Sequence, residues 1–276
     1  MRVKRILSII ALLLATPSAS AQTEDGTALV PAFQREVDRR LELPGEVRQR
    51  YAQLLEAALT GAETPFAKSQ YVLVLDRNPH VQALFLYWLD LQAYPPNLYF
   101  IGASPVSTGK PGAYDCFITP IGVFAHTLAN KDFRAEGTRS KLGIRGFGRK
   151  GMRVYDFGWV DGERSWGRGG YSPMRLLMHA TDPDYLEQHL GEPMSKGCIR
   201  IPATLNEFID RYGILDADYE QALASGKKLW MIRPDRTPTA WSGRYLVIVD
   251  SGSTERPAWS PAPQQPGAEK DSGLVR

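Results

Sequence analysis

From Tyr71 onward, the chain is a series of short apolar runs. They are rich in β-branched and aromatic residues, and Pro, Gly or Asn separates them, which is the pattern of short β-strands joined by turns. The runs are YVLVLD, ALFLYWLD, LYFIGASPVSTG, GVFAHTLA, RLLMHA, KLWMIRP and GRYLVIVD. We therefore predict a mainly β domain over residues 68–250.

The preceding segment, residues 22–67, has a different periodicity. Between Ala28 and Leu59, apolar residues recur every three or four positions, as they do on one face of a helix. Pro44 and Gly45 interrupt this pattern. We predict two short helices that pack on the β domain.

Two later segments also depart from the strand pattern. TLNEFIDRYG predicts a helix from Thr204 to Gly213, with Thr204 as the N-cap and Glu207 at the capping-box position. Residues 251–276 are rich in Pro, Ser and Gly and contain a single aromatic residue. Such a composition predicts a mostly disordered tail.

The first 21 residues have the layout of a secretory signal peptide. A basic start precedes the apolar run Ile6–Ala15, and the small residues Ala19-Ser20-Ala21 form a cleavage site. The apolar run is about half the length that a membrane span needs. We predict that residues 1–21 are removed and that the protein works in the periplasm, without a membrane span.

Removal of these residues leaves a neutral protein. The chain has 33 Lys and Arg against 30 Asp and Glu, and residues 1–21 hold three of the basic residues and none of the acidic ones. Neutrality argues against nucleic acid as a partner. Positive charge is concentrated in residues 134–175, which carry ten basic and four acidic residues. This segment is either a solvated loop or a loop over a site for an anionic substrate.

Cys198 lies in the stretch MSKGCIRIP and has few possible partners. A disulfide with Cys116, the second cysteine, is one interpretation for an exported protein. Metal binding is disfavoured because no C-x-x-C or H-x-x-x-H spacing is present. We interpret Cys116 as a small interior residue, and Cys198 as a nucleophile that needs a histidine to accept its proton.

Four histidines could serve as that base. His80 follows a turn signal, and His189 lies in a polar stretch. His126 ends a predicted strand and is better explained as a surface or core residue. His179 ends the apolar run RLLM immediately before the turn signal ATDPD, and strand ends are where scaffolds place reactive groups. We therefore pair His179 with Cys198.

The neighbours of Cys198 fit a nucleophilic role. Gly197 lets the backbone approach a substrate closely, and the N–H groups of Gly197 and Cys198 are candidates to bind a developing oxyanion. Ser195 and Arg200 flank the turn, where they could fix its shape or bind a carboxylate.

After His179 come fifteen intervening residues and then Ser195-Lys196-Gly197-Cys198-Ile199-Arg200. This pattern resembles the signature of the L,D-transpeptidase (YkuD-type) catalytic domain. Two earlier elements, VSTG (106–109) and ITPIGVF (118–124), resemble strands of that domain in the same order. The resemblance covers residues 69–234. It implies an L,D-transpeptidase-type β-sandwich with the cysteine in a cleft on one face.

The resemblance also implies chemistry on peptidoglycan stem peptides, without a cofactor or a metal. The Cys198 thiolate would attack the carbonyl on the L-centre of the third stem residue, and His179 would carry the proton. The backbone carbonyl of Ala180 would orient the imidazole. Lys196 and Arg175 are predicted to contact the substrate.

Two other functions remain open at this stage. Water in place of the acceptor amine, which would come from a second stem or a protein lysine, would make the enzyme an L,D-carboxypeptidase or an amidase. A cleft that only holds stem peptides would make the protein a non-catalytic peptidoglycan-binding module. The oligomeric state does not follow from the sequence.

Overall fold

The computed structural model describes residues 25–62, 66–261 and 263. The predicted signal peptide and residues 264–276 of the predicted tail lie outside the described residues. Within the described part of the chain, no helix is long and apolar enough to cross a membrane.

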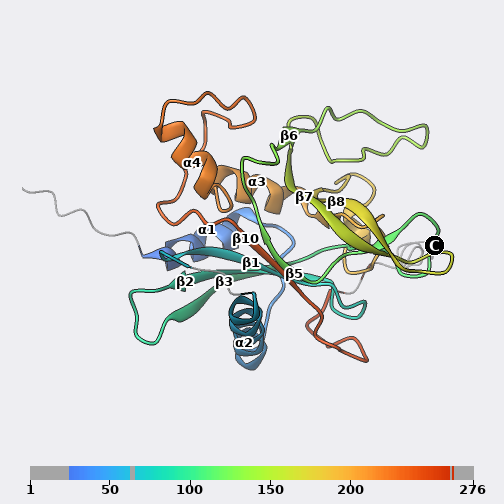
Figure 1. Ribbon diagram of the computed structural model, residues 1–276, viewed down its shortest axis with the longest axis horizontal. Coiled ribbons are helices and arrows are strands. Elements are labelled where there is room, and N and C mark those ends of the chain that lie inside the picture. The colour runs from blue at the N-terminus through green and yellow to red at the C-terminus, as the bar shows by residue number, and fades with distance from the viewer. Residues whose placement is uncertain (1–24, 63–65, 262, 264–276) are drawn as a thin grey trace, which may run out of the picture.

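Two mixed sheets form the body of the molecule, so the predicted mainly β architecture is confirmed (Figure 1). The first sheet has the order β3 (Asn97–Pro105), β2 (Ala83–Asp90), β1 (Gln70–Asp76), β10 (Tyr245–Val249) and β5 (Gly122–Ala125). The second has the order β4 (Phe117–Ile118), β7 (Arg153–Arg164), β8 (Tyr171–Ala180) and β9 (Ile199–Ile201), and β6 (Phe133–Arg134) pairs with β7. Each sheet contains one parallel pair, β1 with β10 and β8 with β9.

Helices cover both faces of the first sheet. The helical segments are η1 (Gly26–Ala28), α1 (Leu29–Glu36), α2 (Gly45–Gly61), η2 (Glu187–His189), α3 (Ala203–Tyr212) and α4 (Ala217–Ala224). Figure 1 shows α2 on one side of the sheet and α1 with α3 on the other. The two N-terminal helices predicted from the apolar periodicity are therefore confirmed, and α2 begins at Gly45, where the pattern is interrupted.

The packing explains why β1 is apolar at nearly every position. Leu73 and Leu75 belong to the core cluster that contains α1, α3 and the inner residues of the second sheet. Val72 and Val74 belong to the cluster that contains α2. Because both faces of the strand are covered, its sequence is a continuous apolar run rather than an alternating one.

The Gly- and Arg-rich segment 134–175 contains more regular structure than predicted. It includes the twelve residues of β7 and the start of β8, so only residues 135–152 and 165–170 connect strands. The strand was missed because Arg153 and Asp156 carry charges that suggest a surface loop, yet both side chains are fully buried. Their counter-ions come from other elements.

Two further predictions differ from the structure. KLWMIRP forms turns instead of a strand, because its backbone interacts with an arginine side chain from β6 instead of pairing in a sheet. The helix α3 ends at Gly213 as predicted, but its N-cap is Pro202, and the Thr204 hydroxyl instead donates to Asp38.

The first residues of the predicted tail belong to the fold. Trp259 makes ring contacts with Tyr51 of α2 and Phe85 of β2. The Ser260 hydroxyl donates to the carbonyl oxygen of His80, in the turn between β1 and β2. The contacts of Trp259 and Ser260 thus hold residues that composition alone predicts to be disordered.

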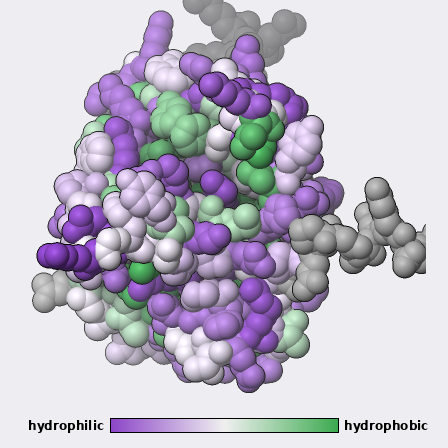
Figure 2. Space-filling view, turned by 90° about the vertical axis from the view of Figure 1, so that its right-hand side faces the viewer, coloured by the Kyte–Doolittle hydropathy of each residue, from purple (hydrophilic) through white to green (hydrophobic). Residues whose placement is uncertain are grey.

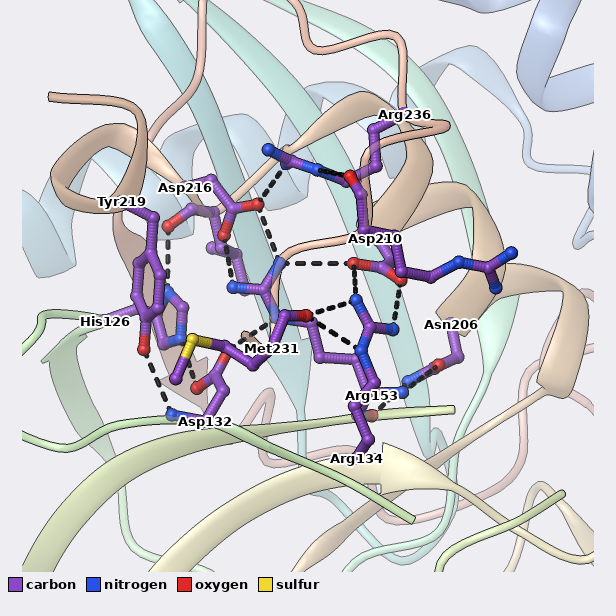
Figure 3. A network of polar contacts seen from close by, with 12 residues as sticks. His126, Asp132, Arg134, Arg153, Asn206, Asp210, Asp216, Tyr219, Met231 and Arg236 are labelled. Carbon is purple, nitrogen blue, oxygen red and sulfur yellow. Dashed lines mark hydrogen bonds and ion pairs between the residues drawn. The ribbon is translucent and has the colours of Figure 1, made fainter. Parts of the chain in front are cut away.

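A buried network of charges joins the second sheet to α3 and α4 (Figure 3). Arg153, which is fully buried, donates to Asp132 at 2.6 Å and makes two 2.7 Å bonds to Asp216. It also contacts Asp210 of α3 at 3.2 Å. Arg134 of β6 binds the same Asp210, so residues on both sides of the 135–152 connection are held to α3.

His126 completes this network and is a core residue, as one of its two interpretations predicted. Its Nδ1 faces the carbonyl oxygen of Leu215 at 2.9 Å, and its Nε2 faces Asp132 at 2.7 Å. Both neighbours accept hydrogen bonds, so only the doubly protonated imidazolium satisfies both. Burial opposes this charge, but the Asp132 carboxylate overcomes it and raises the pKa of His126.

We predict that Asp132→Asn lowers the free energy of unfolding by about 3–5 kcal/mol, because it leaves buried Arg153 and His126 without this counter-ion. Asp235→Asn is the matched control, since it breaks an exposed ion pair with Arg233, and we expect a far smaller loss because solvent screens that pair. Urea unfolding measures both changes. Equal, small losses of unfolding free energy in the two variants would show that the buried charge network contributes little to stability.

The wild-type protein should also lose stability as the pH rises. The raised pKa of His126 means that its contribution is complete below the ordinary histidine pKa of 6.5 and is lost as the pH passes through the folded value. This loss should be smaller in Asp132→Asn. Urea unfolding at pH 6 and pH 9 tests the difference.

Candidate active site

The parallel pairing of β8 with β9 places the predicted residues together. His179 lies directly beside Arg200, and Met178 lies beside Ile199. Side chains alternate along a strand and paired residues share a face. Met178 and Ile199 are buried in the core between the sheets, so His179 and Arg200 point to the opposite, outer face.

Cys198 comes immediately before β9, and its thiol lies near the guanidinium of Arg200 and the backbone of Leu177. A backbone hydrogen bond joins the thiol to Leu177, two positions before His179 on β8. The charge of Arg200 acts on both the Cys198 thiol and the His179 imidazole. The candidate nucleophile and the candidate base therefore occupy neighbouring strands on one face of the second sheet.

Ser195 holds the turn that carries Cys198. Its hydroxyl donates to the carbonyl oxygen of Cys198 at 2.5 Å and accepts from the N–H of Gly197 at 3.0 Å. In this conformation the Gly197 N–H is therefore already bonded, and its predicted role as an oxyanion donor stays a prediction. Gly197 is required for another reason: its φ is +128°, and an added Cβ would lie 2.9 Å from Met174.

The two upstream motifs support this turn from its other side. The Thr119 hydroxyl donates to the carbonyl oxygen of Gly197 at 2.8 Å and accepts from the N–H of Gly109 at 2.9 Å. The N–H of Ser195 donates to the carbonyl oxygen of Thr108. A Cβ at Gly109 would lie 1.8 Å from the carbonyl oxygen of Phe117, so only glycine allows this approach. Three motifs that are distant in sequence thus form one support.

Gln82 extends the support and was not anticipated from the sequence. Its side-chain amide accepts from the N–H of Thr108 and donates to the Thr108 hydroxyl, both at 2.8 Å. Gln82 is fully buried in the loop before β2. No periodicity or motif marks it, because its role depends on a contact with a residue 26 positions away.

Burial sets the protonation states of the pair. It lowers the pKa of His179 to about 4, although a hydrogen bond with the carbonyl oxygen of Ala180, at 2.8 Å, acts in the opposite direction. This is the hydrogen bond through which the Ala180 carbonyl is predicted to orient the imidazole. Burial raises the pKa of the Cys198 thiol, against the effects of Leu177 and Arg200. Near neutral pH, the resting pair is a neutral imidazole and a neutral thiol.

The hydrogen bond also determines the tautomer of His179. The carbonyl oxygen of Ala180 can only accept, so Nδ1 carries the hydrogen. The lone pair is then on Nε2, which is the atom available to accept a proton. This arrangement suits a general base that acts when a substrate arrives.

The connection 135–152 covers this site. Phe147 packs edge-on against the His179 ring, with centroids 4.7 Å apart at an angle of 82°. The backbone N–H of Arg145 donates to Asp182 at 2.7 Å, and Arg145 and Arg149 both bind Asp184. The acidic turn that follows His179 therefore anchors the basic connection directly above the site.

This anchoring corrects the interpretation of the basic segment. The connection does lie over the site, but Arg139, Arg145 and Arg149 are neutralised by Asp182 or Asp184. These charges hold the connection in place and are not free to attract an anionic substrate. The two hydrogen-bonded arginines lower the pKa of Asp184 to about 2.

A cavity of about 1010 Å³ lies under the connection. It is lined by Lys196 and Arg200, which flank the Gly197–Cys198 pair, and by residues of the connection and Trp230. Figure 2, which views the molecule from the side of the distal ends of β7 and β8, shows a mainly hydrophilic surface with separate apolar patches in its upper half.

The other predicted site residues have different surroundings. Lys196 forms an exposed ion pair with Asp115. Arg175 lies on the outer face of β8, where its guanidinium binds the buried Asp156. Both predicted substrate contacts are thus already paired. Cys116 is buried, as predicted, and both cysteines are free thiols, so the alternative disulfide is not present.

The chain has little similarity to known proteins. No family model matches it, and no curated protein matches it significantly. Among solved structures, the chain is similar to a fused zinc-dependent amidase/peptidase/peptidoglycan-binding domain-containing protein from Clostridium acetobutylicum, with a TM-score of 0.32 and 13% identity. The alignment covers 76% of this chain and 64% of the other, so the chain spans just under two thirds of that protein.

We predict that Phe147→Ala raises the pKa of His179 from about 4 towards its ordinary value of 6.5, because water then reaches the imidazole. An NMR titration of the ring protons of His179 measures the change. Leu142→Ala is the control, since Leu142 lines the same cavity but is 83% exposed. An unchanged pKa in Phe147→Ala would mean that other groups alone exclude water from the ring.

Proposed function

We propose that this chain is a periplasmic cysteine L,D-transpeptidase with the type of β-sandwich catalytic domain that the motifs predict. The observation that carries the proposal is the convergence of these motifs. His179 and Cys198 share one face of the β8–β9 pair, and the S-T-G and T-P-x-G elements hold the turn of the nucleophile. A structural cysteine would not require this support.

The proposed reaction begins with proton transfer from the Cys198 thiol to Nε2 of His179. The sulfur then attacks the carbonyl carbon on the L-centre of the third residue of a stem peptide. The C–N bond to the terminal D-residue breaks, and His179 returns the proton to the leaving amine. The product is an acyl-thioester on Cys198.

An acceptor amine completes the cycle. It attacks the thioester carbonyl, loses a proton to His179, and releases the Cys198 sulfur, which recovers that proton. The acceptor belongs to a second stem or to a protein lysine. The developing oxyanion would be bound by the N–H of Cys198, since the N–H of Gly197 is bonded to Ser195.

The protonation states support general-base activation in this scheme. The low pKa of His179 keeps the imidazole neutral and able to accept a proton at neutral pH. Phe147 and the connection 135–152 cover the ring. Limited access of water would favour an amine over water as the acceptor, which is why transfer is proposed before hydrolysis.

We predict that the wild-type protein, expressed without residues 1–21, converts tetrapeptide muropeptides into cross-linked dimers. Cys198→Ala should abolish turnover, and His179→Ala should reduce it by at least about 100-fold. Cys116→Ala is the matched control and should retain activity, because Cys116 is a buried free thiol that the proposed reaction does not use. Mass spectrometry of the products measures all four proteins.

The same experiment separates the alternatives. Tripeptides without dimers would identify an L,D-carboxypeptidase or amidase. Absence of turnover, together with an unchanged protein mass after exposure to a carbapenem, would identify a non-catalytic binding module. Full activity in Cys198→Ala would exclude the proposed mechanism.

A further inference from the structure

Arg200 differs from the other arginines around the cavity. Its side chain is half-buried on β9 and lines the cavity. Within the part of the chain that the structure describes, its guanidinium makes no hydrogen bond or ion pair. The other two arginines that line the cavity, Arg134 and Arg139, each have a carboxylate partner, and so do Arg145 and Arg149 of the connection 135–152.

A half-buried cation without a counter-ion is costly. Burial removes water from the guanidinium, and the loss of hydration is normally offset by an anion. The Cys198 thiol is close, but its raised pKa leaves it neutral in the resting protein. The positive charge of Arg200 is therefore unbalanced until an anion enters the cavity.

The shape of the cavity limits which anions fit. Its volume of about 1010 Å³ is at the upper end of the range for small-molecule sites, roughly 300–1,000 Å³. Apolar side chains of Leu142, Phe147 and Trp230 form part of its wall. A small inorganic anion would leave these walls without contacts, whereas a carboxylate on a peptide would use both the cation and the apolar surface.

We propose that Arg200 binds a carboxylate of the peptide substrate beside Cys198. The planar guanidinium can make two parallel hydrogen bonds to a carboxylate, which would orient the peptide as well as hold it. This inference rests on the proposed function, because a stem peptide supplies the ligand. The two carboxylates nearest the scissile bond are the candidates: the C-terminal one on the leaving residue and the side-chain one on the third residue.

The test measures binding in the Cys198→Ala background, where neither turnover nor an effect of Arg200 on the thiol can contribute. Isothermal titration calorimetry compares a tetrapeptide that has both carboxylates with peptides amidated at one or the other. Removal of the bound carboxylate should weaken affinity at least about tenfold. The peptide that shows the loss identifies the carboxylate.

Arg200→Gln, added to Cys198→Ala, should weaken the affinity for the unmodified tetrapeptide by a similar factor. It should leave the affinity for the peptide that lacks the bound carboxylate unchanged. Arg233→Gln is the control, because Arg233 does not line this cavity and is paired with Asp235 on the surface; it should change affinity less than about twofold. If Arg200→Gln does not fold, Arg200→Lys, which keeps the charge, should still prefer the free acid.

The inference is overturned if neither amidation weakens binding to the protein that retains Arg200, or if Arg200→Gln weakens acid and amide equally. Turnover of the wild-type protein is a separate measurement. Cross-linking activity without a carboxylate preference would reject only the role of Arg200. A carboxylate preference that depends on Arg200, without any turnover, would reject only the proposed enzyme.

Discussion

The pairing of β8 with β9 is the constraint on which the site depends. His179 and Arg200 lie side by side on the outer face because Met178 and Ile199 are buried on the inner face. A shift of one residue in either strand would expose these apolar side chains and bury the polar ones. The hydrophobic core between the sheets therefore determines the geometry of the polar site on the other side.

Charge is arranged around this constraint in two layers. On the inner side, Arg153 and its aspartates join β7 to α3 and the start of α4. On the outer side, the acidic turn after His179 anchors the basic connection 135–152. Both layers use arginine–carboxylate pairs, and both hold the same connection, one at its base and one above the site. Arg200, which has no carboxylate partner among the described residues, remains as an unpaired cation that lines the cavity.

Much of the fold followed from local patterns, and the failures share a cause. Strands such as β1 and β2 and the helix α2 were predicted because their apolar periodicity records burial directly. The strand β7 was missed because the partners of Arg153 come from segments up to 63 residues away. The packed start of the tail was missed because it depends on Trp259 contacting α2 and β2.

By itself, the sequence determined the chemical groups of the site, because the spacing of His179 and Cys198 and the two upstream motifs are local features. Only the tertiary structure decided which of these groups are buried, covered or already paired. It bonded the N–H of Gly197 to Ser195, paired Arg175 and Lys196 with aspartates, and placed Phe147 on the imidazole. Hydrogen bonds, ion pairs and burial depend on residues that are distant in the chain, and these contacts exist only after folding.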